Sequence, residues 1–206
     1  MADIIEPLNI IPSEIILNIY QQRVRSNNTD LNGIRGIPNY KSKLVWDELA
    51  RGPKLIITDN GKVVQASNDC NVSHQNVRTK VAFDINGIFE WDVIIEKVCG
   101  YAWVGVCAPK DLNYESFVGY QPTGWVLGSN GSCCHNHSHL PNYCPPFGDG
   151  TKITVHLDMN KKTIAFTVNG TKYPEVSGWN NLPSKLYPVA SLSYPGCFRI
   201  QPHENA

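Results

Sequence analysis

The sequence predicts an all-β protein, a two-sheet antiparallel β-sandwich with a short N-terminal helix. From about residue 44 onward, short runs alternate apolar and polar side chains, as strands with one buried face do. Frequent turn signals separate the runs, which is typical of antiparallel sandwiches. In the strongest run, Ile88–Glu96, we expect Phe89, Trp91, Val93 and Ile95 to share the inner face.

The expected strands are short and follow one another along the chain. In order, they are Lys54–Asp59, Val63–Ala66, Val77–Phe83, Ile88–Glu96, Ala102–Cys107, Trp125–Leu127, Lys152–Asp158, Thr163–Val168, Tyr187–Leu192 and Cys197–Gln201. Asn60-Gly61 and Asn86-Gly87 predict hairpin turns, because Asn and Gly tolerate positive φ. Asp158–Lys161 predicts a further tight turn, and 128–150 is the one long irregular segment expected.

The N-terminal region differs in character from the rest of the chain. Residues 1–43 are expected to form one helix and a linker, and residues 44–206 the sandwich. Ser13 suits the N-cap of this helix, and Ile15, Ile16 and Ile19 follow at helical spacing. The helix has two alternative roles: docking to another protein, or packing its isoleucine stripe on the sandwich.

Composition narrows the possible partners and the compartment. The 206 residues hold 18 basic and 18 acidic side chains with no basic stripe, so a nucleic-acid partner is not expected. No apolar run approaches the roughly 20 residues that span a bilayer, and no membrane partner is expected. Seven cysteines without a signal-peptide pattern predict reduced thiols and a cytoplasmic location, with the nucleus as the alternative.

Several fragments of the second half occur together in a recognisable order. They are Gly87–Val93, Ala102–Val106, Gly124–Gly128, Phe147–Ile153, Leu157-Asp158 with Thr163–Gly170, and Leu186–Ser191. Together they resemble the SPRY domain family from about Trp46 to Pro202. The resemblance implies a concanavalin A-like sandwich, a jelly roll, that acts as a non-catalytic protein-interaction module. It implies no cofactor, and a protein or short peptide partner bound by loops at one end.

The candidate binding residues lie in two loops. Tyr114, Tyr120, Pro122 and Thr123 belong to a polar and aromatic loop, whose tyrosines suit an interaction hot spot. In the SPRY proteins that recruit substrates through a SOCS box, a tyrosine before a Val-Gly step contacts the peptide, and Tyr114 matches it. An aromatic residue before the last strand contacts ligand there as well, and Tyr194 falls near that position.

The N-terminal segment Leu8–Tyr20 is similar to the opening helix of an F-box. The Asn- and Gly-rich stretch that follows does not continue that motif, so the helix is interpreted as a remnant or a docking helix. With the SPRY resemblance, it raises the hypothesis of substrate recognition for ubiquitin ligation, with a ubiquitin-ligase scaffold as a further partner.

Two other classes of function remain as alternatives. Glu90, Asp92 and Glu96 are expected on the outer face of one strand, where paired carboxylates could serve a glycoside hydrolase. Their spacing is one residue longer than the Glu-x-Asp-x-x-Glu pattern, and we interpret them as solvated surface groups. A carbohydrate-binding lectin could use the same sandwich, and an exposed tryptophan on a concave sheet would favour it.

Two further groups of side chains are candidate sites. Cys133, Cys134, Cys144 and the histidines between them could hold zinc, but no Cys-x-x-Cys pair is present. A solvent-facing loop with polar histidines is the favoured interpretation, and metal binding stays open. Trp103, Trp125 and Phe166 could form a ligand platform, but alternation favours the core.

Overall fold

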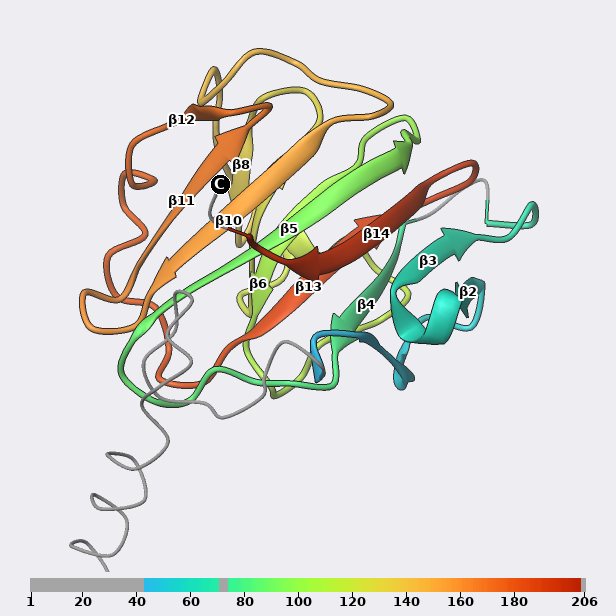
Figure 1. The fold of residues 1–206 in the computed structure, drawn as a ribbon, viewed down its shortest axis with the longest axis horizontal. Helices are drawn as coiled ribbons and strands as arrows, with labels where there is room; N and C mark the ends of the chain where they lie inside the picture. The colour runs from blue at the N-terminus through green and yellow to red at the C-terminus, as the bar shows by residue number, and fades with distance from the viewer. Residues whose placement is uncertain (1–42, 71–73, 205–206) are drawn as a thin grey trace, which may run out of the picture. The chain divides into compact units, whose positions relative to one another are not determined.

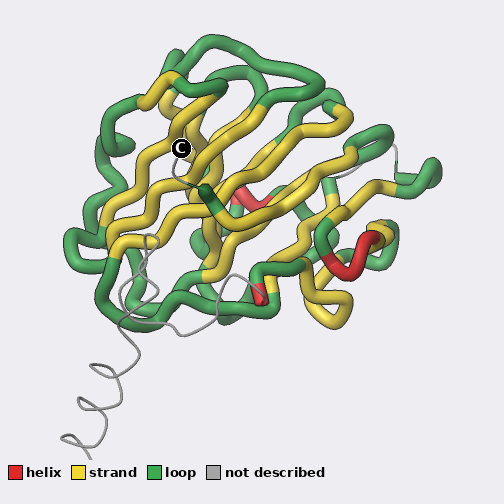
Figure 2. Tube along the Cα trace, viewed as in Figure 1, coloured by secondary structure: helices red, strands yellow, loops and turns green. Residues whose placement is uncertain are grey.

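The computed structural model describes residues 43–70 and 74–204, which form two antiparallel sheets of seven strands each. The predicted N-terminal helix and the boundary at residue 43 lie outside or at the edge of these residues. No helix in the described ranges is long and apolar enough to cross a membrane. Figures 1 and 2 show the two layers of strands, with only short helical turns between them.

Sheet A has the strand order β1-β4-β13-β6-β7-β8-β9. Its strands are β1 (Trp46–Arg51), β4 (Gln75–Thr79), β6 (Trp103–Cys107), β7 (Gly124–Gly128), β8 (Cys133–His135), β9 (Ser138–Leu140) and β13 (Tyr187–Leu192). A loop of residues 108–123, containing the 3-10 helix η3 (Val118–Tyr120), connects β6 to β7.

Sheet B has the order β12-β11-β10-β5-β14-β3-β2. Its strands are β2 (Leu55–Thr58), β3 (Val63–Ala66), β5 (Ile88–Lys97), β10 (Lys152–Asp158), β11 (Thr163–Val168), β12 (Thr171–Lys172) and β14 (Cys197–Pro202). The 3-10 helix η2 (Asp59–Gly61) joins β2 to β3. Strand β5 lies at the centre, between β10 and β14 (Figure 1).

The core lies between the sheets and contains the predicted inner face of β5. Phe89, Trp91, Val93 and Ile95 are each at most 1% exposed, which confirms the period-two assignment. Phe83 stacks on Phe89 with ring centroids 4.3 Å apart. Of the three candidate platform residues, Trp125 and Phe166 belong to this core, at 8% and 0% exposed. Trp103, 4% exposed, is buried instead in a second cluster on the other face of sheet A.

Two of the three predicted turns form hairpins. Asn60-Gly61 joins the paired strands β2 and β3, with positive φ at both residues. In the β10–β11 hairpin, the Asp158 carboxylate accepts hydrogen bonds from the backbone N–H groups of Asn160 (2.9 Å) and Lys161 (3.0 Å). This Asx-type bonding is what Asp contributes to a turn.

The hairpin predicted at Asn86-Gly87 is wrong. The strand before it, β4, belongs to sheet A, whereas β5 belongs to sheet B, so the segment crosses between the sheets. Phe83 in this crossing forms an isolated bridge with Leu186 instead of continuing β4. The expected irregular segment 128–150 is also partly wrong, because β8 and β9 form a hairpin that extends sheet A. Strands β1 and β12 were not predicted.

Candidate functional site

The 108–123 loop covers the outer face of sheet A with a second, smaller apolar cluster. Trp103, Val126 and Val189 contribute from the sheet, and Phe117 and Val118 contribute from the loop. Alternation places these sheet residues on the face opposite the main core. The loop therefore has its own packed base.

Two side-chain amides hold the loop in shape. The Asn76 Nδ2 donates to the backbone oxygens of Asn113 and Ser116, both at 2.6 Å. The Gln121 Nε2 donates to the same two oxygens at 2.9 and 2.7 Å, and its Oε1 accepts from the Asn113 N–H. Because Asn76 is fully buried, its amide is a fixed part of the sheet to which the loop is fastened.

Replacing Asn76 with alanine is expected to lower the free energy of unfolding by about 1–3 kcal/mol, because both hydrogen bonds from the sheet to the loop are lost. Gln121 still donates to the same two oxygens, so neither is left unpaired. Backbone amides of the loop should also exchange with solvent faster, which hydrogen–deuterium exchange measures. Asn68→Ala, at an exposed site, is the control. Unchanged exchange in the loop would contradict the role assigned to Asn76.

An aromatic patch runs along the top of this loop. It is defined here as Tyr101, Trp103, Phe117, Tyr120 and His137. Ring centroids lie 6.4 Å apart for Tyr101–Trp103, 4.6 Å for Trp103–Phe117, 4.9 Å for Phe117–Tyr120 and 4.7 Å for Tyr120–His137. Tyr101 is 53% and Tyr120 47% exposed, whereas Trp103 beneath them is buried. Exposed rings on a packed base are what a protein-binding hot spot needs.

His74 adjoins the patch and is held in place. Its ring lies 5.5 Å from that of Phe117, and its Nε2 lies 2.7 Å from the backbone oxygen of Tyr101. Burial lowers the pKa of His74, and the contact with the Tyr101 oxygen partly opposes this. The imidazole is therefore neutral at pH 7 and adds a polar but uncharged edge to the patch.

The predicted residues of the loop do not all meet. Tyr120 belongs to the aromatic patch, but Tyr114 is half-buried and faces Arg78, whose Nε donates to the Tyr114 hydroxyl at 3.0 Å. Burial opposes the charge of Arg78, but its hydrogen bond to the Tyr114 hydroxyl and the nearby Tyr187 leave its pKa raised. Pro122 is exposed and Thr123 half-buried, where the loop returns to β7.

Tyr194 is 50% exposed in the β13–β14 loop. Strands β13 and β6 are antiparallel, with Ser191 opposite Trp103, so Tyr194 and Tyr101 extend from the same end of sheet A. The Cys99 thiol joins the two loops, since it donates to the Tyr101 oxygen at 3.1 Å and is also hydrogen-bonded to Ser193. Tyr101, Phe117 and His137 were not predicted as site residues.

Comparison with known proteins identifies the framework. The family model described as the SPRY domain matches residues 88–203, which is more than half of the chain. The chain belongs to the SPRY domain family. SPRY domains are generally non-catalytic protein-interaction modules. Among curated proteins, no sequence match was found.

Solved SPRY structures share the fold at low sequence identity. The SPRY domain of human HERC1 superposes with a TM-score of 0.66 at 19% identity, covering 78% of this chain and 99% of that one. A human SPRY domain gives 0.60 at 14% identity, covering 76% and 99%. The TRIM65 PSpry domain gives 0.61 at 15% identity, covering 79% and 93%.

The carboxylates on β5 of this SPRY domain are structural, and their expected solvation is wrong for Asp92. That side chain is 2% exposed and accepts hydrogen bonds from Thr154 Oγ1 at 2.7 Å and His203 Nδ1 at 2.9 Å. Glu96 accepts from Arg199 Nε at 2.6 Å. Hydrolysis needs two carboxyl groups that both reach the sugar, and the central one, Asp92, is buried and hydrogen-bonded, so the hydrolase alternative gains no support.

The third carboxylate belongs to a polar chain across three strands of sheet B. Glu90 Oε1 lies 2.6 Å from His156 Nδ1, and His156 Nε2 lies 2.7 Å from Thr167 Oγ1. His156 pairs with Glu90 in the register of β10 on β5, so this contact is cross-strand. It links the strands side by side, as opposed polar pairs do in sheets.

The cysteines of the predicted loop are not solvent-facing, which corrects that interpretation. Cys133 packs in the main core and Cys134 in the outer cluster, because successive strand residues point to opposite faces. Burial raises the pKa of Cys134 to about 11 and also raises that of Cys144. Within the described ranges, no three His, Cys, Asp or Glu side chains are arranged to hold a metal ion.

The histidines of the same hairpin pack against aromatic rings. His135 stacks on Trp125 at 4.4 Å, and His137 stacks on Tyr120. The β8–β9 hairpin therefore supports the aromatic patch from the side of η3. The many Cys and His residues of this segment raised the possibility of a metal site, but in the structure these side chains pack against aromatic rings and in the apolar clusters.

Proposed function

We propose that this SPRY domain binds a peptide or protein partner through the aromatic patch, with Tyr194 and Tyr114 as flanking contacts. The observation that supports this most is the pair of exposed tyrosines, Tyr101 and Tyr120, on the buried Trp103. Binding-site aromatics are effective when they are held rigid before the partner arrives, since less entropy is lost. Pro122 and Thr123 lie further along the same loop and belong to the polar rim.

The low charge of the patch also supports recognition of the partner by apolar contacts. The defined members of the patch include no Asp, Glu, Lys or Arg, and His74 beside it is neutral. Such a surface suits a partner segment with apolar or aromatic residues at its centre and polar residues at the rim.

The test is affinity capture from cell extract with the full-length chain as bait. The Tyr101→Ala/Tyr120→Ala variant is expected to lose at least about tenfold of the captured partner, because hot-spot aromatics contribute 2 kcal/mol or more. Its melting temperature should change little, since both rings are about half exposed.

The control is Ile56→Ala/Ile88→Ala, which removes two exposed apolar side chains, 44% and 51% exposed, from sheet B. It should retain the partner. Equal capture by the patch variant, or equal loss with the control, would show that the partner does not use the patch.

A finer proposal is that the domain recognises substrates for ubiquitin ligation. It rests on the F-box-like segment Leu8–Tyr20, which lies outside the described residues. Mass spectrometry of the same captures tests it: a ubiquitin-ligase scaffold should be present with wild type and also with the patch variant. Its absence from both would contradict this finer proposal alone.

The lectin alternative has no specific support. All five tryptophans are in the described part of the chain, and each is at most 8% exposed. The exposed tryptophan that would favour a lectin is therefore absent from the described residues.

A further inference from the structure

A second concave site lies at the other end of sheet A. It is a pocket of about 690 Å³ lined by Lys43, Val45, Lys80, Val81, Ala82, Asp84, Lys185 and Tyr187. Tyr187 begins β13, whereas Tyr194 follows the end of the same strand. At about 3.3 Å per residue the two tyrosines are roughly 20 Å apart, so the pocket is separate from that end of the proposed site.

The walls of this lysine pocket are fixed by backbone hydrogen bonds. The Lys80 N–H donates to the Val45 oxygen at 3.0 Å, which ties the end of β4 to the segment before β1. Phe83 and Leu186 exchange hydrogen bonds in both directions, at 2.8 and 3.0 Å. The backbone that forms the pocket is therefore preformed, and a ligand would have to order only the exposed lysine side chains.

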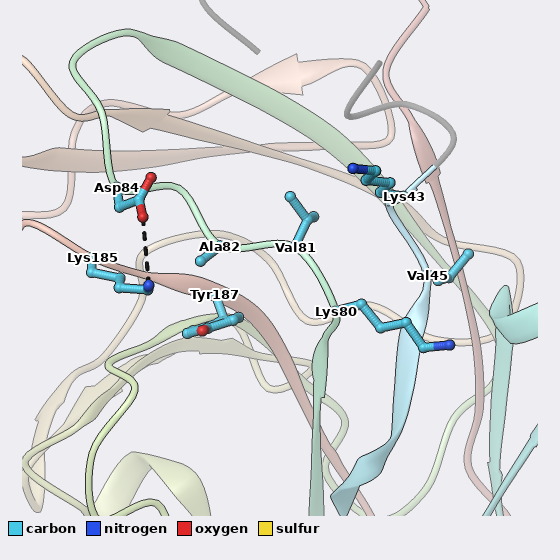
Figure 3. Close-up of a pocket in the computed structure, with 8 residues that line it drawn as sticks. All are labelled: Lys43, Val45, Lys80, Val81, Ala82, Asp84, Lys185 and Tyr187. Carbon is cyan, nitrogen blue, oxygen red and sulfur yellow. Dashed lines mark ion pairs between the residues drawn. The ribbon is translucent and has the colours of Figure 1, made fainter. Parts of the chain in front are cut away.

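The charge in the pocket is unbalanced. Lys185 lies 3.4 Å from Asp84, and this is the ion pair drawn in Figure 3. Lys43 and Lys80 have no acidic partner in the described part of the chain, and both are exposed. Three lysines and one carboxylate thus line the pocket. Arg78, 4.0 Å from the centroid of the Tyr187 ring, adds positive charge behind the wall.

The apolar residues decide which kind of anion fits. Val81, Ala82 and Tyr187 lie between Lys185 on one side and Lys43 and Lys80 on the other, with Val45 beyond these two lysines (Figure 3). A bare inorganic ion would leave these surfaces unused. A peptide that has acidic side chains next to an apolar one can contact both the lysines and the apolar surface. A lysine ammonium is a flexible point charge, so it can pair with a single carboxylate and does not require the two-point geometry that arginine offers.

We propose that the lysine pocket is a second binding site, for an acidic peptide segment of a partner protein. Asp or Glu side chains pair with Lys43 and Lys80, and an adjacent apolar side chain packs on Val81 and Val45. The proposal goes beyond the aromatic patch and does not depend on it, because the two sites use different residues and different chemistry.

The experiment is selection of random twelve-residue peptides by phage display on the full-length chain. Wild type is expected to enrich Asp and Glu at least about twofold over the unselected library, because exposed lysines attract carboxylates at low salt. Selection on Lys43→Gln/Lys80→Gln should return the acidic content to that of the library.

The matched control is Lys110→Gln/Lys172→Gln, which removes the same charge from two exposed lysines elsewhere. It should enrich acidic peptides as wild type does. Wild type without acidic enrichment, or equal loss in both lysine pairs, overturns the proposal.

Two further measurements distinguish between possible ligands of the lysine pocket, and between this pocket and the aromatic patch. An acidic peptide from the selection should bind less tightly at 300 than at 50 mM salt, because screening shortens the reach of the lysines. If 10 mM inorganic phosphate displaces this peptide while 10 mM sulfate does not, the pocket is selective for a phosphoryl group, and the proposal of a carboxylate peptide as its occupant is overturned. Peptides that still bind Lys43→Gln/Lys80→Gln but no longer bind Tyr101→Ala/Tyr120→Ala use the aromatic patch and not the lysine pocket.

Discussion

Replacing Trp91 with alanine is expected to lower the free energy of unfolding by about 3–5 kcal/mol. Trp91 is fully buried at the centre of sheet B, opposite Val155 on β10 and Pro202 on β14. Its ring lies 5.5 Å from that of Phe83, so truncation opens a cavity where the inter-sheet crossing meets the core. Urea unfolding followed by circular dichroism measures the loss.

The control for Trp91 is on the same strand. Ile88 is 51% exposed, and Ile88→Ala is expected to change stability by no more than about 0.5 kcal/mol. A similar, small loss in both variants would show that the Trp91 ring does not fill the core.

The inner face of β5 was predictable because it depends on local alternation alone. The hairpins at Asn60-Gly61 and Asp158–Lys161 were predictable for the same reason, since their turn chemistry lies within the turn. Asn86-Gly87 has equally good turn chemistry, yet the chain there crosses between sheets. Contacts between distant residues decide whether the strand after a turn pairs with the strand before it. Here the deciding contact is the bridge of Phe83 to Leu186, which cannot be predicted from the turn residues themselves.

The buried state of Asp92 could not be predicted from its strand. Its hydrogen-bond partners, Thr154 and His203, are 62 and 111 residues away. Alternation correctly placed Asp92 on the face opposite Trp91, but it could not show that this face is covered. The same argument explains Cys134, which is buried by the 108–123 loop and not by the main core.

The aromatic patch was predicted only through Tyr120. Tyr101, Phe117 and His137 reach it from separate segments, because the order β6-β7-β8-β9 brings those segments together. Because the three residues lie on separate segments of the chain, no local periodicity links them. Tyr101 was detectable in principle, as an aromatic residue between Gly100 and the strand that begins at Trp103. The roles of Tyr114, Tyr120, Pro122, Thr123 and Tyr194 in binding stay predictions.

Replacing Gly105 with alanine is expected to lower the free energy of unfolding by about 3 kcal/mol, the upper range for overpacking. A Cβ at this position would lie 2.0 Å from the Trp125 backbone oxygen and 2.9 Å from the Val126 Cα. These are backbone atoms of the paired strand β7, so no side chain can move aside to relieve the contact. Strands β6 and β7 must separate.

The consequence for the patch follows from the position of Gly105 two residues after Trp103, whose ring supports Phe117. Displacing β6 from β7 should therefore weaken partner capture as well as stability. Gly100→Ala is the matched control, because a Cβ there meets nothing within 4 Å and alanine is expected to be neutral or slightly stabilising. Thermal unfolding and partner capture, measured side by side, distinguish the two glycines; similar behaviour would mean that β6 and β7 do not approach as closely as described.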